Sequence, residues 1–230
     1  MALGLAVSLS TSVWAENTPA KVALDTDAQK VGYSFGQMFG QRLKGSLPEI
    51  EVDAFLAGIR DAYKGEPSRI SQEEMARVMQ AYQAEQQAKQ QQAFEKLAAE
   101  NKARSDAFLA ENAKKEGVVT TASGLQYKVI RQGTGPNATE DDTVVVHYTG
   151  TLTTGEQFDS SVARGQPATF PVKGVIQGWV EGLQLMNKGS KYQLFIPSGL
   201  AYGPNGNGRI GPNEALVFDV ELLDIKQPAQ

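Results

Sequence analysis

The sequence VVVHYTGTLTTGEQFDSS, residues 144–161, alternates apolar and polar side chains and then turns at Gly155. A period of two is typical of a strand that buries one face. Because successive strand side chains point to opposite faces, Tyr148 would lie on one side and His147 on the other. His147 is the single histidine of the chain. We therefore expect His147 to be packed or half-exposed, outside any cavity that Tyr148 lines.

Similar short alternating runs fill the rest of the C-terminal half. They predict strands bounded by glycine and proline, at Leu125–Ile130, Thr143–Thr149, Thr169–Val172, Tyr192–Ile196 and Leu216–Ile225. One short amphipathic helix near residues 175–186 interrupts them, with its apolar side formed by Val175, Ile176, Trp179, Val180 and Leu183. This order predicts an α+β domain in which a twisted antiparallel sheet wraps over one helix.

Residues 24–64 predict two amphipathic helices, separated by Gly45 and Pro48. The first carries Gly32, Gly36 and Gly40 on one face, although each glycine costs a helix about 1 kcal/mol relative to alanine. A smooth stripe of this kind lets another backbone come close. We expect a close helix crossing here, between two subunits; the alternative is that the glycines are incidental or mark bends.

From Ser71 to Glu116 the chain has no glycine or proline. The run opens with a capping box, Ser71 with Glu74 three residues later, and closes with lysines before Gly117. It predicts a helix of roughly 65–70 Å at about 1.5 Å per residue. Its middle, QAEQQAKQQQ, is polar all round and lacks the apolar heptads of a coiled coil. We expect a solvated stalk.

Composition excludes several classes of function. The chain has 230 residues, of which 41% are hydrophobic and 21% charged, with a net charge of −4. The acidic balance and the lack of a basic run do not suggest a nucleic-acid partner. Without cysteine and with one histidine, disulfides, thiolate chemistry and a conventional zinc site are not expected. Neither a phosphate-binding G-x-x-x-x-G-K-[ST] loop nor a G-x-S-x-G elbow occurs, and we expect no cofactor and no metal.

The first 15 residues, MALGLAVSLSTSVWA, are apolar and then small, which is typical of a secretory signal and its cleavage site, although basic residues are missing before them. The alternative is a buried N-terminal strand or helix. The apolar stretch is too short for a lasting transmembrane anchor. We expect export to the periplasm, with outer-membrane or surface association left open.

Four motifs now occur in one order: VVVHYTGTLTTGEQFDSS, then GVIQGW at 174–179, IP…AYG at 196–203 and LVFDVEL at 216–222. Together they resemble the FK506-binding-protein (FKBP) family of peptidyl-prolyl cis/trans isomerases, over residues 117–226. The N-terminal helices and the stalk resemble the macrophage infectivity potentiator (Mip) and FkpA-like branch, whose members are exported, V-shaped dimers. The domains expected are a signal peptide at 1–15, a helical dimerisation domain at 16–70, a connecting helix at 71–116 and an FKBP-type isomerase domain at 117–230.

The resemblance implies the site residues, position by position. The catalytic residues would be Tyr148, Asp159, Tyr202 and Phe218, and the substrate-binding residues Phe158, Val175, Ile176, Trp179, Arg164 and Ile210. Trp179 would form the floor under a proline ring, and the Ile176 amide and Tyr202 hydroxyl would hold substrate carbonyls. Asp159 would accept a hydrogen bond from Tyr148 and pair with Arg164. Residues 202–215, rich in glycine, proline and asparagine, would form a flap beside the pocket.

One position departs from the family pattern. Relatives that bind macrolides tightly have an aromatic residue after the proline that matches Pro167, where this chain has Ala168. We expect rapamycin-like macrolides to bind more weakly for that reason.

The implied function is acceleration of proline isomerisation in unfolded exported proteins, with clients held in the cleft of a homodimer. Two alternatives stay open: a module that binds proline-containing segments or acts as a surface interaction module, in which turnover is secondary, and a structural dimer in which the stalk matters most.

Overall fold

The computed structural model describes residues 22–46 and 50–226, which form two compact units that divide after Met75. The expected signal peptide lies outside the described residues. Within the described ranges, no helix is both long and apolar enough to cross a membrane.

The first unit contains the two predicted helices, α1 (Asp27–Ser46) and α2 (Val52–Lys64). The Glu51 side chain accepts hydrogen bonds from the first amides of α2, and Gly65 ends the helix with a left-handed backbone at φ 70°. The rings of Phe39 and Phe55 stack with their centroids 6.4 Å apart. Many other apolar side chains of this unit are exposed.

Helix α3 (Gln72–Asn112) begins as the capping box predicts, because the Glu74 amide donates to Ser71 Oγ (3.1 Å). It ends four residues before the predicted end, and the chain then turns at Gly117, whose φ is 79°. The glutamine-rich middle is largely exposed, in agreement with a solvated stalk. The prediction fails for the last turns, where Asn101 and Asn112 are each 1% exposed.

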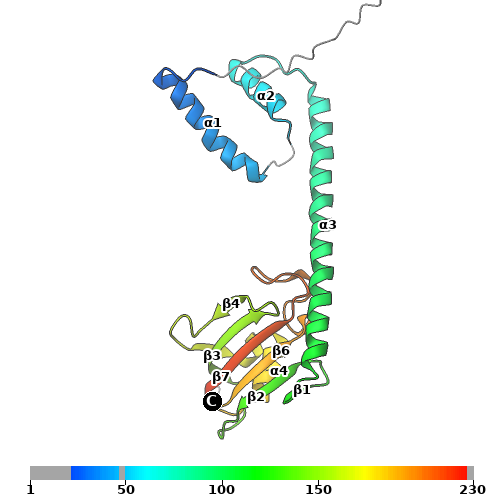
Figure 1. Ribbon diagram of the computed structural model, residues 1–230, viewed down its shortest axis with the longest axis vertical. Coiled ribbons are helices and arrows are strands. Elements are labelled where there is room, and N and C mark those ends of the chain that lie inside the picture. Colours follow the sequence, from blue (N-terminus) through cyan, green and yellow to red (C-terminus); the bar gives the residue numbers. More distant parts are fainter. Residues whose placement is uncertain (1–21, 47–49, 227–230) are drawn as a thin grey trace, which may run out of the picture. The chain divides into compact units, whose positions relative to one another are not determined.

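The second unit is built on one antiparallel sheet with the order β1-β2-β6-β7-β3-β4, and β5 pairs with β3 (Figure 1). Its strands are β1 (Val118–Thr120), β2 (Gln126–Arg131), β3 (Thr143–Leu152), β4 (Gln157–Ser160), β5 (Ala168–Pro171), β6 (Lys191–Ile196) and β7 (Leu216–Lys226). The five predicted strands are present within a few residues. The sequence did not predict β1 and β4, because VVT and QFDS show no clear alternation of apolar and polar side chains.

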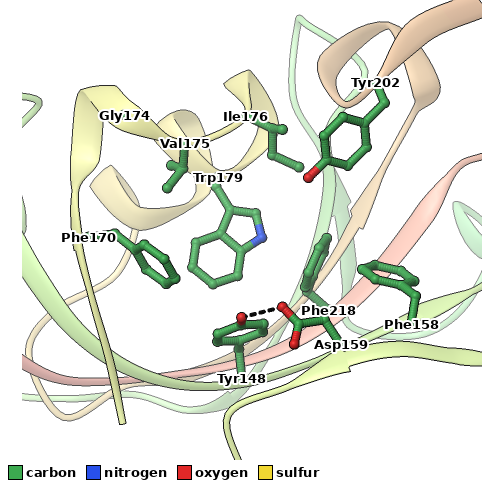
Figure 2. Close-up of a pocket in the computed structure, with 10 residues that line it drawn as sticks. All are labelled: Tyr148, Phe158, Asp159, Phe170, Gly174, Val175, Ile176, Trp179, Tyr202 and Phe218. Atoms are coloured by element: carbon green, nitrogen blue, oxygen red, sulfur yellow. Dashed lines mark hydrogen bonds between the residues drawn. The ribbon is translucent and has the colours of Figure 1, made fainter. Parts of the chain in front are cut away.

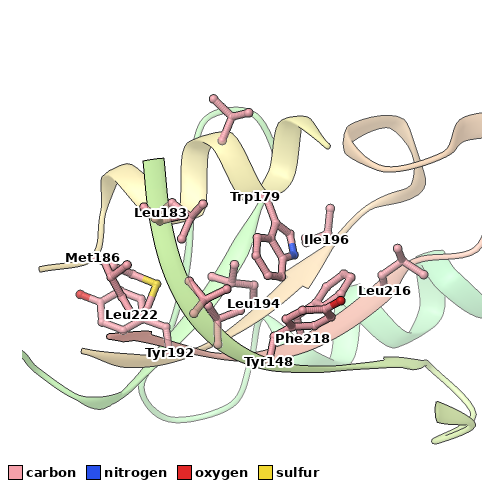
Figure 3. Packing of buried hydrophobic residues seen from close by; sticks show 14 of the residues in the cluster. Tyr148, Trp179, Leu183, Met186, Tyr192, Leu194, Ile196, Leu216, Phe218 and Leu222 are labelled. Atoms are coloured by element: carbon pink, nitrogen blue, oxygen red, sulfur yellow. The ribbon is translucent and has the colours of Figure 1, made fainter. Parts of the chain in front are cut away.

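Helix α4 (Gln177–Gln184) packs against the sheet, and the core lies between them (Figure 3). Two glycines of α4 make this packing possible. A Cβ at Gly178 would come within 2.3 Å of Ile196 Cγ2, and one at Gly182 within 2.7 Å of Leu194 Cδ1. Leu183 of α4 and Leu194 of β6 are both fully buried. A larger residue at either glycine would push the helix, and the pocket residues that it carries, away from the sheet.

Candidate functional site

Strand β3 places Tyr148 in the interior, as the alternation predicts. Val144 and Val146 are fully buried on the same face, and Tyr148 is 6% exposed. The strand lies between β7 on one side and β4 and β5 on the other. Tyr148 therefore stands where the sheet and α4 enclose the largest side chains of the domain.

A cavity of about 500 Å³ opens at this place (Figure 2). Residues from β3, β4, β5, α4, β7 and the loops before α4 and β7 line it: Tyr148, Phe158, Asp159, Phe170, Gly174, Val175, Ile176, Trp179, Tyr202 and Phe218. The structure thus brings together eight of the ten residues that the sequence singled out. Their assigned roles are not tested by this placement.

The walls are aromatic rings that meet edge to face. Trp179, at the centre, lies 5.3 Å from Tyr148 and 5.2 Å from Phe218 between ring centroids, with interplanar angles of 89° and 84°. Phe158 meets Phe218 in the same manner at 5.5 Å. This is the preferred geometry of aromatic pairs. Gly150 is required beneath them, because a Cβ there would come within 2.7 Å of both phenylalanine rings.

Phe170 is a lining residue that the sequence analysis missed. It lies on β5 and contacts the Trp179 ring at 5.9 Å. Residues two apart on a strand share a face, so Phe170 lies on the same face as Ala168, the position where relatives that bind macrolides tightly have an aromatic residue. We call this edge of the cavity, around Ala168, the rim. Gly174, also missed, lies in the turn before α4.

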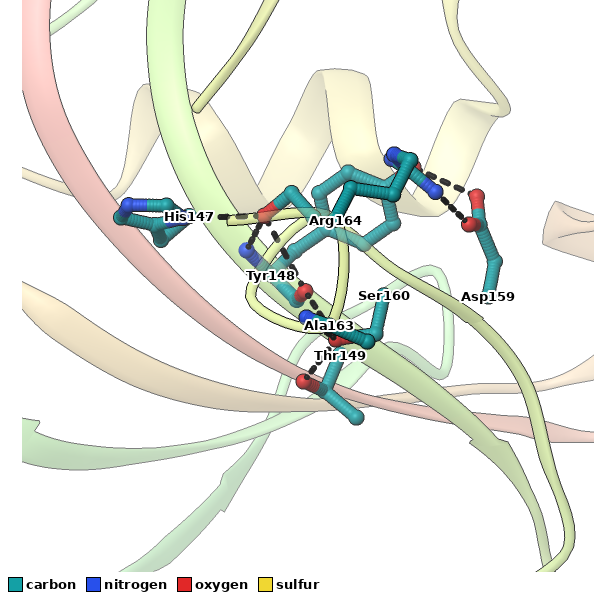
Figure 4. Close-up of polar contacts among 8 residues, drawn as sticks. His147, Tyr148, Thr149, Asp159, Ser160, Ala163 and Arg164 are labelled. Atoms are coloured by element: carbon teal, nitrogen blue, oxygen red, sulfur yellow. Dashed lines mark hydrogen bonds and ion pairs between the residues drawn. The ribbon is translucent and has the colours of Figure 1, made fainter. Parts of the chain in front are cut away.

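Asp159 binds both Tyr148 and Arg164. The Tyr148 hydroxyl donates to Asp159 Oδ2 (2.5 Å), and the Arg164 guanidinium pairs with the other carboxylate oxygen and donates to the Tyr148 hydroxyl (2.9 Å) (Figures 2 and 4). Arg164 also lies over the Tyr148 ring. Three side chains from β3, β4 and the loop after β4 thereby fix one wall of the cavity.

These contacts keep both groups in one protonation state near neutral pH. Burial acts to raise the pKa of Asp159, but hydrogen bonds from Tyr148 and Arg164 outweigh it, and the pKa is lowered. Burial, with the hydrogen bond to Asp159, raises the pKa of Tyr148. Because the folded pKa of Asp159 is lowered, its ionised form stabilises the fold above a pH of about 4, and that contribution is lost as the pH falls through the lowered value.

His147 points away from this wall (Figure 4). Its Nδ1 lies 3.1 Å from Ser161 Oγ, which also accepts from the Tyr148 amide (2.8 Å). Ser160 Oγ accepts from the Ala163 amide and contacts Thr149 Oγ1. His147 thus belongs to a group of polar contacts that holds the loop carrying Arg164 against β3.

Two of the predicted site residues do not line the cavity. Arg164 acts on it through Asp159 and Tyr148. Ile210 is 7% exposed and packs in the hydrophobic core, and its backbone pairs with Asn207 in both directions. In this position Ile210 supports the loop that follows Tyr202, and its direct contact with substrate stays a prediction.

The cavity can desolvate a compact apolar ring and the polar group attached to it. The indole Nε1 of Trp179 is buried and has no hydrogen-bond partner within the described part of the chain. Ile176 precedes the first residue of α4, so its amide is not bonded within the helix. Among the described residues, no group of three or more His, Asp or Glu side chains is placed to hold a metal ion.

Comparisons with known proteins cover nearly the whole chain. Residues 28–129 match the family described as a domain amino terminal to FKBP-type peptidyl-prolyl isomerase. Residues 135–223 match the family described as FKBP-type peptidyl-prolyl cis-trans isomerase. The two matches follow the order of the helical part and the sheet.

Individual relatives agree. The outer membrane protein MIP of Legionella longbeachae is 42% identical, and the match covers 98% of this chain and 96% of that protein. The FKBP-type 22 kDa peptidyl-prolyl cis-trans isomerase of Escherichia coli is 47% identical over 87% of this chain and 97% of that protein. The crystal structure of FkpA from Escherichia coli superposes with a TM-score of 0.78 at 41% identity, covering 89% of this chain and 99% of that one.

Proposed function

The chain belongs to the FKBP-type peptidyl-prolyl cis-trans isomerases, and from this membership we propose that it turns X–Pro bonds of unfolded exported proteins in the cavity around Trp179. The observation that carries the assignment of the site is the aromatic cavity of about 500 Å³, in which the carboxylate of Asp159 accepts a hydrogen bond from Tyr148. Six aromatic side chains line this cavity, against four in the groove along α1 and α2.

Rotation about an X–Pro bond is slow because the amide must lose its resonance, at a barrier of about 20 kcal/mol. The planar amide is more dipolar than the twisted one, so water favours the planar ground state. A dry aromatic cavity removes part of that preference and binds the twisted form better, which is differential binding of the transition state. No nucleophile and no proton transfer are needed.

Each residue then has a part in this mechanism. Trp179 is the floor beneath the proline ring, and Tyr148, Phe158, Phe170 and Phe218 form the walls. The Ile176 amide and the Tyr202 hydroxyl hold substrate carbonyls. Asp159 fixes the orientation of Tyr148, and Arg164 holds Asp159.

A proline-containing tetrapeptide in a protease-coupled assay tests the activity. We expect the protein at substoichiometric concentration to accelerate the slow cis-to-trans phase. Binding of the peptide without acceleration would instead favour the alternative, a module that holds proline-containing segments.

We further propose that the chain is an exported homodimer in which residues 16–70 dimerise, residues 71–116 connect and residues 117–230 catalyse. Export is supported by the apolar start and by relatives that include an outer membrane protein. Dimerisation is supported by an open groove of about 980 Å³ along α1 and α2, which Gly32, Gly36 and Gly40 line together with exposed apolar side chains. A Cβ at any of these glycines meets nothing within 4 Å, so the stripe is free to receive a second chain. Two tethered cavities would hold a client protein between them.

Replacing Ala168 with phenylalanine should tighten rapamycin binding. Ala168 shares a face of β5 with Phe170 and is half-buried at the edge of the core, so a larger ring there extends the wall. An added aromatic contact contributes about 0.5–1.5 kcal/mol, which is up to about a tenfold change in affinity. Calorimetry measures it, with Thr169→Phe on the opposite, exposed face as the matched control. Unchanged affinity in Ala168→Phe would show that the rim does not limit macrolide binding.

A further inference from the structure

The segment that follows Tyr202 is tied to α3. Residues 203–215 lead from Tyr202 to β7, and in Figure 1 this loop lies beside the lower turns of the long helix, within the second unit. Tyr202 lines the cavity at one end of the loop, and β7 carries Phe218 beyond its other end. The position of this loop therefore sets one side of the cavity.

Two side chains of α3 bind the backbone of the loop. Asn101 Nδ2 donates to the carbonyl oxygen of Pro212 (2.9 Å). Ser105 Oγ donates to the carbonyl oxygen of Asn213 (3.0 Å) and accepts from the amide of Ala215 (2.8 Å). Asn101 and Ser105 are 1% and 3% exposed, so these bonds form away from water, where a lost partner is costly.

Asn213 of the loop makes two further hydrogen bonds. Its side-chain Nδ2 donates to the carbonyl oxygen of Ala98 on α3 (3.1 Å). Its backbone amide donates to the carbonyl oxygen of Gly203, next to Tyr202 (2.9 Å). Asn213 has φ 56°, the one positive value among the non-glycine residues that the structure describes. A left-handed asparagine costs free energy and persists where its surroundings hold it. Here the surroundings are α3 and Gly203.

An ion pair reinforces the same place. Arg104 Nη2 donates to Glu214 Oε1 and to Asn101 Oδ1, both at 2.6 Å. Glu214 is 5% exposed, so its carboxylate is removed from water and paired with Arg104. The loop is packed closely as well, because a Cβ at Gly211 would lie 2.8 Å from Asn101 Nδ2.

From these contacts we propose that Asn101 and Ser105 of α3 are positioning residues for isomerisation, which hold residues 212–215 and through them Tyr202 at the cavity. The long helix is then part of the isomerase unit as well as a connector. The inference rests on the proposed role of Tyr202 in turnover. A fragment beginning at Gly117 would therefore lack Asn101 and Ser105, which hold the loop beside its cavity.

The test compares two buried asparagines of one helix. Asn101→Ala removes the bond to the loop. Asn112→Ala removes an equally buried asparagine, whose Nδ2 donates to Gln126 Oε1 (3.0 Å) and not to residues 203–215. Both variants are made in the full chain and measured with a proline tetrapeptide at a temperature where circular dichroism shows each to be folded. We expect Asn101→Ala to lower kcat about fivefold with little change in KM, and Asn112→Ala to stay within about twofold.

Two further readouts separate positioning from general destabilisation. Amide hydrogen exchange of residues 203–215 should accelerate in Asn101→Ala and not in Asn112→Ala. In a Tyr202→Phe background, the added effect of Asn101→Ala on kcat should fall below about twofold, because coupled residues are not additive.

Equal losses in the two asparagine variants, or unchanged turnover in Asn101→Ala, would overturn the proposal. So would an effect of Asn101→Ala that keeps its full size without the Tyr202 hydroxyl. A wild-type chain without turnover would overturn the proposed function and with it the positioning role, while the exchange measurement would still report whether α3 holds the loop.

Discussion

Replacing Phe218 with alanine should lower kcat/KM for a proline peptide by more than about tenfold, which corresponds to at least 1.4 kcal/mol of lost transition-state stabilisation. Phe218 is 5% exposed and its ring touches those of Trp179, Tyr148 and Phe158. Its removal would admit water to the cavity, whose exclusion of water is the basis of the proposed mechanism. Asp159→Leu should have an effect of similar size, because it frees the Tyr148 hydroxyl and leaves Arg164 without its carboxylate.

His147→Ala is the matched control, since it alters the neighbour of Tyr148 on the opposite face of β3 and should leave kcat/KM within about twofold. A buried Phe→Ala change also costs about 3–5 kcal/mol of stability, so Phe218→Leu, which keeps most of the apolar volume, accompanies it. Circular dichroism confirms the fold of each variant. Full turnover in folded Phe218→Leu and Asp159→Leu, or loss of turnover in folded His147→Ala, would contradict the assigned site.

Gly36→Leu should convert the proposed dimer to a monomer and remove most of the activity in proline-limited refolding of a protein client, while turnover of a tetrapeptide is kept. The leucine would fill the groove of α1 that we propose for the second chain. A tetrapeptide needs one cavity, whereas an unfolded client can bind two. Tethering two sites raises avidity by about 10²–10⁴ when the geometry fits, so the loss on protein clients is expected to be large.

Gly58→Leu is the control for this variant, because Gly58 is also inside a helix with open space around its Cβ position but does not line the groove. Light scattering gives the mass of each variant, and the two assays are run on the same samples. A Gly36→Leu chain that remains dimeric would show that the glycine stripe is not part of the dimer interface. A monomer that refolds protein clients at the full rate would remove the need for two cavities.

Much of the site was predictable from sequence, for local reasons. The period-two pattern of β3 fixed the opposite facing of Tyr148 and His147, and the turn at Gly155 brought Phe158 and Asp159 to the neighbouring strand. The resemblance implied the other lining residues except Phe170 and Gly174. The strand of Phe170 was predicted, but whether its ring reaches the cavity depends on the pairing of β5 with β3, which the local sequence does not contain.

The packed end of α3 could not be read from the pattern, for a physical reason. The residues of α3 that face the rest of the second unit follow helical spacing, but they are Asn101, Ser105 and Asn112, with Phe108 as the aromatic member. No apolar stripe occurs there, because the burial is compensated by hydrogen bonds. Asn101 and Ser105 bond to a loop more than a hundred residues away in sequence, and Asn112 bonds to Gln126. Local sequence does not contain those partners.

The central claim, that rotation in the cavity needs no proton transfer, is tested most directly by the pH dependence of turnover. Exchange NMR on a proline peptide avoids a coupling protease, whose own activity varies with pH. The lowered pKa of Asp159 keeps it ionised and the raised pKa of Tyr148 keeps it protonated, so we expect kcat/KM to be flat between about pH 6 and pH 9. A bell-shaped profile, or a pH dependence that disappears in His147→Ala, would contradict the account, because it would place an acid or base in the reaction.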